Sequence, residues 1–303
     1  MPQGDDRDGD RGQMLLVAAL GLAVAFVALA LVLNAVVFTE NLATRNPDAA
    51  DDALAFEGAV TEGVGGLLAE TNRHNDTDYA TLDDALRAGV VAWDANASRL
   101  TAADGTVTAV ELRAATNGTR IVQETAGAFT ADDGATAWMV AGDVSGVRRF
   151  VVVADPASTS PVSVNVSDGD GDYWRVDVAD DGSGDATVTV TENGSTVTIP
   201  HDDATVAVDL TEGTVNGSDA GVTFAAGVDA PFDVTVSDGD RATGRYQLFV
   251  DRELGAFATD APTTRPAIYR ATVDVTVHRS SVTYESPVAL APEDAPGNDT
   301  LTQ

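Results

Sequence analysis

From Thr106 onward the chain alternates apolar and polar residues with a period of two, and this pattern limits its fold more than any other feature. Neighbouring side chains of a strand point to opposite faces, so the pattern predicts strands with one buried face. Clear examples are the segments 162–166, 187–191, 205–209 and 272–277. Gly-Asp and Asn-Gly turns separate about ten to twelve such segments, which predicts an antiparallel β-sandwich-like region. The continuously apolar segment 150–154 is expected to be a central strand.

Residues 46–102 carry a helical pattern instead. Asn46 and Pro47 are typical of a helix start, because Asn caps the first turn and the missing N–H of Pro costs nothing there. A second helix is expected to begin near Thr81. Apolar residues at helical spacing predict one buried stripe on each helix: Val60, Val64, Leu67 and Leu68 on the first, and Leu82, Leu86, Val90, Trp93, Ala97 and Leu100 on the second. We expect these stripes to pack against the sheet, although a stripe can also bind a partner.

No charged residue lies between Arg11 and Glu40, and the stretch 14–38 is almost wholly apolar. At 1.5 Å per residue, about 25 residues of helix span roughly 37 Å, which is more than the roughly 30 Å of a hydrocarbon layer. The stretch therefore predicts a transmembrane helix at 13–39, with the lipid bilayer as partner through residues 14–38. A cleaved secretory signal is an alternative, but its apolar region is shorter.

The positions of the Arg residues predict the orientation of this helix. Arg7 and Arg11 precede the apolar stretch, and Arg45 follows it. Positive residues favour the cytoplasmic side, so residues 1–12 are expected to be a cytoplasmic leader. The C-terminal domain would then lie outside a cell membrane that the chain crosses once.

The expected fold class is a single N-terminal transmembrane helix followed by a mostly β, α+β part, in which two short helices precede the antiparallel β-sandwich-like region. The β-rich domain is expected at 103–290, with a seam between two β units near 168–172. The Pro residues and sparse apolar residues of 291–303 predict a loose tail.

The run Arg11-Gly12-Gln13-Met14, followed directly by the apolar stretch, resembles the class III signal of archaeal type IV pilins. This resemblance implies that a prepilin-peptidase-like enzyme cuts between Gly12 and Gln13. The block 11–45 also resembles the N-terminus of an uncharacterised haloarchaeal family of pilin-like surface proteins, which implies other pilin-like subunits as partners. The block departs from the major pilins in lacking the early Pro and the acidic residue within the helix that many of them carry. An uncleaved membrane anchor is the alternative interpretation.

The chain has 48 acidic and 17 basic residues, a formal charge of −31, and every basic residue is Arg. At ordinary ionic strength such a charge makes a compact protein repel itself, whereas at 1 M salt the screening length falls to about 3 Å. The composition therefore predicts a halophilic protein. An acidic disordered chain is the alternative, but 44% hydrophobic residues are unlike one. Nucleic acid is not expected as a partner, because clustered basic residues are missing.

Seven Asn residues lie in Asn-x-Ser/Thr triplets, the acceptor pattern for N-glycosylation of surface loops. These candidates are Asn75, Asn96, Asn117, Asn165, Asn193, Asn216 and Asn298. Turn or tail composition surrounds four of them, which predicts a glycoprotein. The alternative is that Asn-Gly turns happen to precede the Ser and Thr that strands favour.

Asp168, Asp170 and Asp172 alternate in a Gly-rich loop and form a weak candidate for Ca²⁺. Tyr173 occupies the sixth position, where an EF-hand-like loop needs Gly, so a solvated acidic turn is the favoured interpretation. The chain has no Cys, and its three His residues are far apart in sequence without metal-ligand spacing. No catalytic, cofactor-binding or metal site is therefore assigned, and no cofactor is expected. Tyr173 and Trp174 are candidates to line a carbohydrate or partner site.

The sequence thus favours a non-enzymatic cell-envelope protein, pilin-like or pilus-associated, that displays an extracellular β domain in a haloarchaeon. The alternative function is a membrane-anchored extracellular binding module that is not assembled into filaments.

Overall fold

The computed structural model describes residues 47–74, 77–280 and 282–294. The described residues divide into two compact units, one that contains residues 47–55, 279–280 and 282 and another that contains residues 56–74, 77–278 and 283–294. The first unit includes an ion pair between Asp52 and Arg279. Both sheets and the candidate site belong to the second unit.

Two long helices come first in the described chain: α2, Pro47–His74, and α3, Tyr79–Ala102. Pro47 is the first residue of α2, the position at which a missing N–H is harmless. The side chain of Asp78 caps α3, because its Oδ1 accepts a hydrogen bond of 2.8 Å from the Thr81 amide. The helix starts predicted near residues 46 and 81 are therefore correct to within about two residues.

Each helix buries one stripe, as the spacing predicts. Val60, Val64 and Leu68 are buried on α2, and Leu82, Leu86 and Val90 are buried on α3. Leu100, expected in the same stripe, is instead exposed near the end of α3. Gly63 of α2 leaves room for the indole of Trp93, whose ring lies 6.0 Å from that of Phe56.

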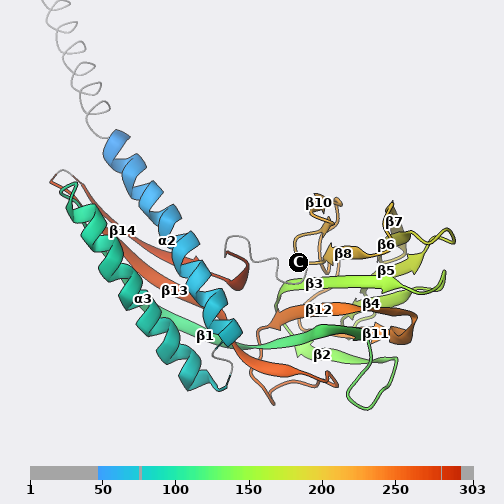
Figure 1. The fold of residues 1–303 in the computed structure, drawn as a ribbon. Helices are drawn as coiled ribbons and strands as arrows, with labels where there is room; N and C mark the ends of the chain where they lie inside the picture. Colours follow the sequence, from blue (N-terminus) through green and yellow to red (C-terminus); the bar gives the residue numbers. More distant parts are fainter. Residues whose placement is uncertain (1–46, 75–76, 281, 295–303) are drawn as a thin grey trace, which may run out of the picture. The chain divides into compact units, whose positions relative to one another are not determined.

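After α3 the regular structure consists mainly of antiparallel strands (Figure 1). Their bounds are β1, Val107–Ala128; β2, Trp138–Val144; β3, Val147–Pro156; β4, Val162–Ser167; β5, Tyr173–Asp180; β6, Ala186–Glu192; β7, Ser195–Pro200; β8, Val206–Asp209; β9, Thr214–Val215; β10, Ser218–Asp219; β11, Phe232–Ser237; β12, Ala242–Val250; β13, Thr264–His278; and β14, Thr283–Leu290. Short 3₁₀ turns lie at Gly239–Arg241 and Pro292–Asp294.

The strands form two sheets. The eight-stranded sheet has the order β10-β9-β8-β3-β12-β1-β13-β14, and the six-stranded sheet has the order β2-β11-β4-β5-β6-β7. The strand β3, which holds the apolar segment 150–154, lies between β8 and β12, so the expectation of a central strand is confirmed.

The 22-residue strand β1 takes part in both halves of the eight-stranded sheet. Near its start it contacts α3, where the Val110 amide donates a hydrogen bond of 2.8 Å to Asp94 Oδ1. It pairs with β13 from Val107 to Ile121 and with β12 from Thr119 to Ala128. The long strand therefore links the part of the sheet against α3 to the part against the six-stranded sheet.

The main hydrophobic core lies between the two sheets. The largest fully buried side chains there include Phe150 and Leu248 of the eight-stranded sheet and Trp174 of the six-stranded sheet. Alternating Val residues of β4, β5, β6 and β11 point into this core, so the polar residues between them point away from it.

The fold class predicted from the sequence is wrong. Among the described residues no helix has the length and apolarity to cross a membrane. The helices are not short, with 28 and 24 residues, and acidic side chains such as Glu57 and Glu62 interrupt the apolar character of α2. The antiparallel β-rich part of the prediction fits, but it comprises sheets of eight and six strands, one of which also packs on a helix.

Several predicted segments fall on residues that the structure does not describe. The leader at 1–12 and the transmembrane helix at 13–39 lie outside the described residues, as do residues 295–303 of the expected tail. The residues expected to form a seam, 168–172, form the turn between β4 and β5 within one sheet.

Candidate binding face on the six-stranded sheet

The face of the six-stranded sheet that points away from the core carries two aligned rows of polar side chains, which we call the polar face. Each row crosses β11, β4, β5, β6 and β7 in register. The first row is Ser237, Ser163, Asp177, Thr189 and Thr198, and the second is Thr235, Asn165, Arg175, Thr191 and Thr196. Neighbouring strands are about 4.8 Å apart, so five strands give a row roughly 19 Å long.

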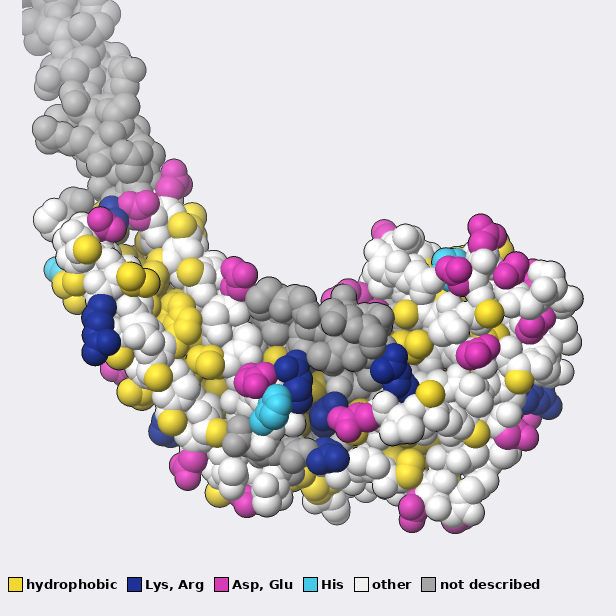
Figure 2. Space-filling view, viewed as in Figure 1, with side chains coloured by type: hydrophobic (Ala, Val, Ile, Leu, Met, Phe, Trp, Pro, Cys, Tyr) yellow, Lys and Arg dark blue, Asp and Glu magenta, His cyan; other side chains and the backbone are white. Residues whose placement is uncertain are grey.

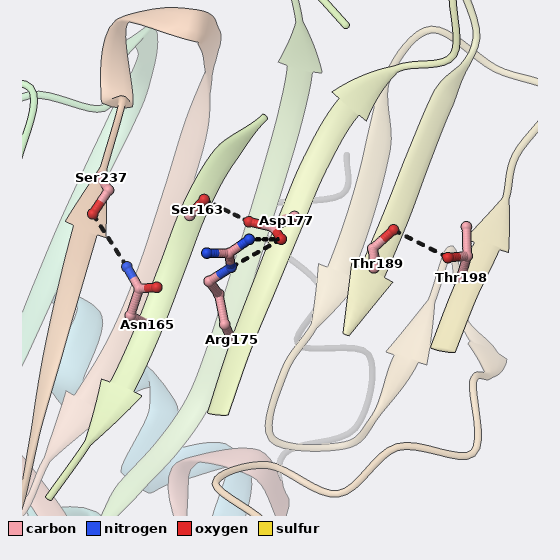
Figure 3. Close-up of polar contacts among 7 residues, drawn as sticks. All are labelled: Ser163, Asn165, Arg175, Asp177, Thr189, Thr198 and Ser237. Atoms are coloured by element: carbon pink, nitrogen blue, oxygen red, sulfur yellow. Dashed lines mark hydrogen bonds and ion pairs between the residues drawn. The ribbon is translucent and has the colours of Figure 1, made fainter. Parts of the chain in front are cut away.

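A charged group stands at the centre of the polar face (Figure 3). Arg175 donates to Asp177 Oδ2 from Nε at 2.9 Å and from Nη2 at 2.6 Å. Ser163 Oγ donates to the other carboxylate oxygen at 2.5 Å. Both oxygens of Asp177 are therefore bonded, which is what a largely buried carboxylate needs. The Arg175 side chain remains 43% exposed and presents positive charge to the solvent.

Weaker polar contacts extend the same face to both sides (Figure 3). Asn165 Nδ2 donates to Ser237 Oγ at 3.2 Å, and the hydroxyls of Thr189 and Thr198 lie 3.3 Å apart. These bonds hold the side chains of adjacent strands in fixed positions. The polar face is thus a preorganised array of hydroxyl, amide, guanidinium and carboxylate groups.

Tyr173 lies two residues before Arg175 on the same face of β5 and is 39% exposed. Trp174, the other aromatic candidate from the sequence, is 1% exposed and points into the core, where it packs edge-on to Phe224. The structure therefore places only Tyr173 where a ligand of the polar face could reach it.

The glycosylation candidates differ in how their amides are engaged. Asn117 Nδ2 donates to Glu253 at 2.8 Å, Asn193 Oδ1 accepts from the Tyr173 amide, and Asn216 Oδ1 accepts from the Ala207 amide. Asn165 belongs to the polar face. By contrast, Asn96 is exposed on α3. Asn75 and Asn298 lie outside the described residues.

The structure does not support a Ca²⁺ site at the β4–β5 turn. Asp168 Oδ1 accepts hydrogen bonds from the amides of Asp170, Gly171 and Asp172, and its Oδ2 accepts from the Asp229 amide. Desolvation opposes ionisation, but these backbone bonds outweigh it and lower the pKa of the Asp168 carboxyl. Within the described residues, no three His, Cys, Asp or Glu side chains come together as a metal site would require.

The three His residues are separated in the structure as they are in the sequence. His74 is the last residue of α2, His201 contacts Asn216, and the His278 ring lies 2.8 Å from Thr283 Oγ1.

A cavity of about 20 Å³ lies inside the main core and is lined mostly by Val and Phe side chains. Tyr246 also lines it, and the Tyr246 hydroxyl has no hydrogen-bond partner among the described residues. Desolvation raises the pKa of this hydroxyl. The cavity has room for about one water molecule, so it is too small to be a ligand site.

Acidic side chains are scattered over the molecular face shown in Figure 2. On this face the acidic residues are therefore not gathered at one site.

Residues 8–136 match a family of unknown function (DUF7261). No curated protein and no solved structure matches the chain. The matched range includes both described helices and β1 and ends before β2. The polar face, from Ser163 to Ser237, therefore lies wholly outside the part of the chain that resembles this family.

The strands that form the polar face can be predicted from the sequence, but the alignment of their polar side chains cannot. Alternation in Val162–Ser167 and Ala186–Glu192 shows which residues avoid the core. The alignment of Asp177 with Ser163 and Thr189 depends on strand register, which alternation leaves open.

Proposed function

We propose that the chain is a non-enzymatic, pilin-like or pilus-associated protein of the haloarchaeal cell envelope that displays its β-rich domain outside the cell. The observation that carries this proposal is the run Arg11-Gly12-Gln13-Met14 directly before the uncharged stretch 14–38. A prepilin peptidase processes the chain between Gly12 and Gln13, the lipid bilayer contacts residues 14–38, and other pilin-like subunits are its partners.

The surface chemistry of the described domain supports display in a salty medium. A formal charge of −31 is tolerable where salt shortens the screening length to a few ångströms, about 3 Å at 1 M. Most polar-face side chains are small and uncharged, and its central charges are paired, so the face keeps its hydrogen-bonding character at high salt.

Glycosylation belongs to this proposal, with Asn96 as the preferred acceptor in the described chain. Asn96 is exposed on α3. By contrast, the Nδ2 atoms of Asn117, Asn193 and Asn216, to which a glycan would be attached, contact Glu253, the Gly227 carbonyl and His201 respectively. A glycan on any of those three would have to displace a native contact. Glycopeptide mass spectrometry should therefore find the highest occupancy at Asn96.

A second candidate function is an envelope binding module that never enters a filament. The observation that favours it is the exposed ring of Tyr173 beside the preorganised rows of the polar face. An aromatic ring next to hydroxyl, amide and guanidinium groups suits a polysaccharide, because sugars offer both apolar faces and hydroxyls. The ligand class would be a surface polysaccharide.

Shearing filaments from the surface of native cells distinguishes between the two proposed functions. A pilus-associated protein should appear with the sheared filaments, and replacing Gly12 by a bulky residue should leave it unprocessed in the membrane fraction. If the protein never leaves the membrane fraction, the pilin-like proposal fails.

The binding module then has its own test. Arg175→Ala should weaken polysaccharide binding by about tenfold, equivalent to about 1.4 kcal/mol. The matched variant Arg87→Ala removes an exposed Arg on α3, paired with Asp83 at 3.1 Å, and should bind like the wild type. Equal binding by both variants would exclude the polar face as the site.

A further inference from the structure

The four edge strands of the two sheets differ in how they are protected against pairing. The edge of β2 is covered by the chain near Ala258, which accepts a hydrogen bond of 2.8 Å from the Gly142 amide. The edge strand β14 contains Glu285 and an internal Pro287, and β10 has only two residues. Charges, Pro and short length all discourage a sheet edge from binding another strand.

The fourth edge strand, β7, has no covering segment among the described residues, no charged residue and no internal Pro, and it is six residues long. Its sequence, Ser195–Pro200, has no charge and consists mostly of β-branched residues, with its only Pro at the last position. It is largely exposed, and Val197 is 51% exposed although it is an aliphatic residue within a strand. An uncharged edge is unexpected in a chain with a formal charge of −31.

The turn geometry shows which groups of β7 point outward. Asn193 and Gly194 form a two-residue turn with φ of 43° and 92°, and Glu192 pairs with Ser195 across it. In such a hairpin the residues beside the turn bond to each other, and bonded pairs then alternate. The amide of His201 accordingly donates to the Ala186 carbonyl at 3.0 Å. Thr196 and Thr198 therefore direct their N–H and C=O groups away from β6.

We propose that β7 binds β7 of a second copy of this chain in an antiparallel arrangement with two-fold symmetry. Thr196 of one copy then pairs with Thr198 of the other, and this happens twice, so both N–H and both C=O groups of each edge are used. Val197 faces its own equivalent in the non-hydrogen-bonded pair between them, and the two exposed side chains bury each other. No charged side chain lies in the paired segments.

This pairing joins the two six-stranded sheets into one continuous sheet. Thr198 and Thr196 end the first and the second row of the polar face, so in this register the first row of one copy continues into the second row of the other. The interface is narrow, and we expect the association to be weak and to strengthen with salt, which screens the repulsion between two acidic copies.

Single-Cys variants of the full chain test the proposal, since the chain has no Cys of its own. The Cα atoms of a non-hydrogen-bonded antiparallel pair are about 4.5 Å apart, within the roughly 4.4–6.8 Å that a disulfide spans. Under mild oxidation in high salt, Val197→Cys should form a covalent dimer at least about tenfold faster than Val107→Cys, a control at another exposed Val. Equal rates would overturn the proposal.

The register gives a stricter test. Thr196→Cys mixed with Thr198→Cys should form the mixed dimer faster than either variant forms a dimer with itself. If Thr196→Cys links to itself as fast as to Thr198→Cys, the proposed register is wrong.

A non-covalent measurement completes the test without relying on Cys. In sedimentation equilibrium at high salt, Val197→Lys should weaken dimerisation by at least about tenfold, because a charge in the pair cannot be buried without a partner. Val91→Lys, at a similarly exposed Val on α3, should leave it unchanged. A wild-type chain that stays monomeric throughout the accessible concentration range contradicts the proposal.

Discussion

Asn72 bonds both backbone polar groups of Ile268: its Nδ2 donates to the Ile268 carbonyl at 2.9 Å, and its Oδ1 accepts from the Ile268 amide at 2.7 Å. The strand β14 pairs with β13 only from Ala271 onward, so no described strand lies beside the backbone of Ile268 on the side of Asn72. The Asn72 side chain on α2 takes the place of that strand and satisfies a buried edge.

Asn72→Leu should lower the free energy of unfolding by about 2 kcal/mol or more, because it leaves a buried N–H and a buried C=O without partners. The control Asn96→Leu, at an exposed position of α3, should change it by less than about 0.5 kcal/mol. Urea titrations of both variants at one high salt concentration provide the comparison. If Asn72→Leu lowers the free energy of unfolding no more than Asn96→Leu does, the contact between Asn72 and Ile268 is unimportant for stability.

Two Gly residues of α2 should respond to Ala in opposite directions. A Cβ on Gly63 would lie 2.3 Å from Trp93 Nε1, so Gly63→Ala should destabilise the domain by about 1–3 kcal/mol through overpacking. A Cβ on Gly58 would meet no atom of the described residues within 4 Å, so Gly58→Ala should stabilise the domain by about 0.5–1 kcal/mol through helix propensity. Thermal unfolding of the two variants measures the difference. Stabilisation by both would mean that Trp93 does not pack against Gly63.

The helical stripes and the strands could be predicted from the sequence because both depend on local periodicity. Val60, Val64 and Leu68 are buried at helical spacing, and the alternating segments become strands. The role of Asn72 could not be predicted, since its partner Ile268 is 196 residues away. Nothing local in the sequence distinguishes Asn72 from the exposed Asn96.

The order of the strands was likewise beyond prediction. The first strand, β1, pairs with β12 and β13, which are the twelfth and thirteenth along the chain. Alternation identifies the buried face of each strand but not its neighbour. The polar face arises from five strands in register, so its candidate residues could be named individually but not assembled.

Tyr246→Phe should stabilise the domain by about 1 kcal/mol, because it removes a buried hydroxyl for which the described part of the chain offers no hydrogen-bond partner. Its effect should depend on pH. The pKa of the Tyr246 hydroxyl is raised in the folded state, so the folded state holds the proton more tightly than the unfolded state. Wild-type stability should therefore fall as the pH rises above about 10, the unfolded pKa of Tyr.

The Tyr246→Phe variant should lose less stability than the wild type as the pH rises above about 10. Unfolding titrations at pH values on either side of about 10 would measure this difference. The control Tyr173→Phe, at the exposed Tyr of the polar face, should change stability by less than about 0.5 kcal/mol. A destabilised Tyr246→Phe variant would indicate that the hydroxyl has a bonded partner.

Salt should raise the melting temperature steeply between roughly 0.1 and 2 M KCl, and NaCl should act similarly, because screening is the cause. Six exposed acids whose carboxylates form no hydrogen bond in the described structure are suitable for neutralisation: Asp84, Asp104, Glu111, Asp132, Asp202 and Asp203. Changing all six to Asn or Gln takes the formal charge from −31 to −31 + 6 = −25. Repulsion energy grows with the square of the charge, so the salt dependence should weaken by about a third.

Salting-out of apolar surface also raises the melting temperature, but it acts equally on both proteins. The difference between their slopes therefore isolates the charge. An unchanged slope in the six-residue variant would mean that self-repulsion does not explain the acidity of the chain.

The proposal of a pilin-like envelope protein depends most directly on processing at the N-terminus. Mass spectrometry of the protein from native membranes and surface filaments should find a mature chain that begins at Gln13, because the bond after Gly12 is the expected cleavage site. A chain that begins at Met1, or one cut beyond Ala30, would contradict the proposed function.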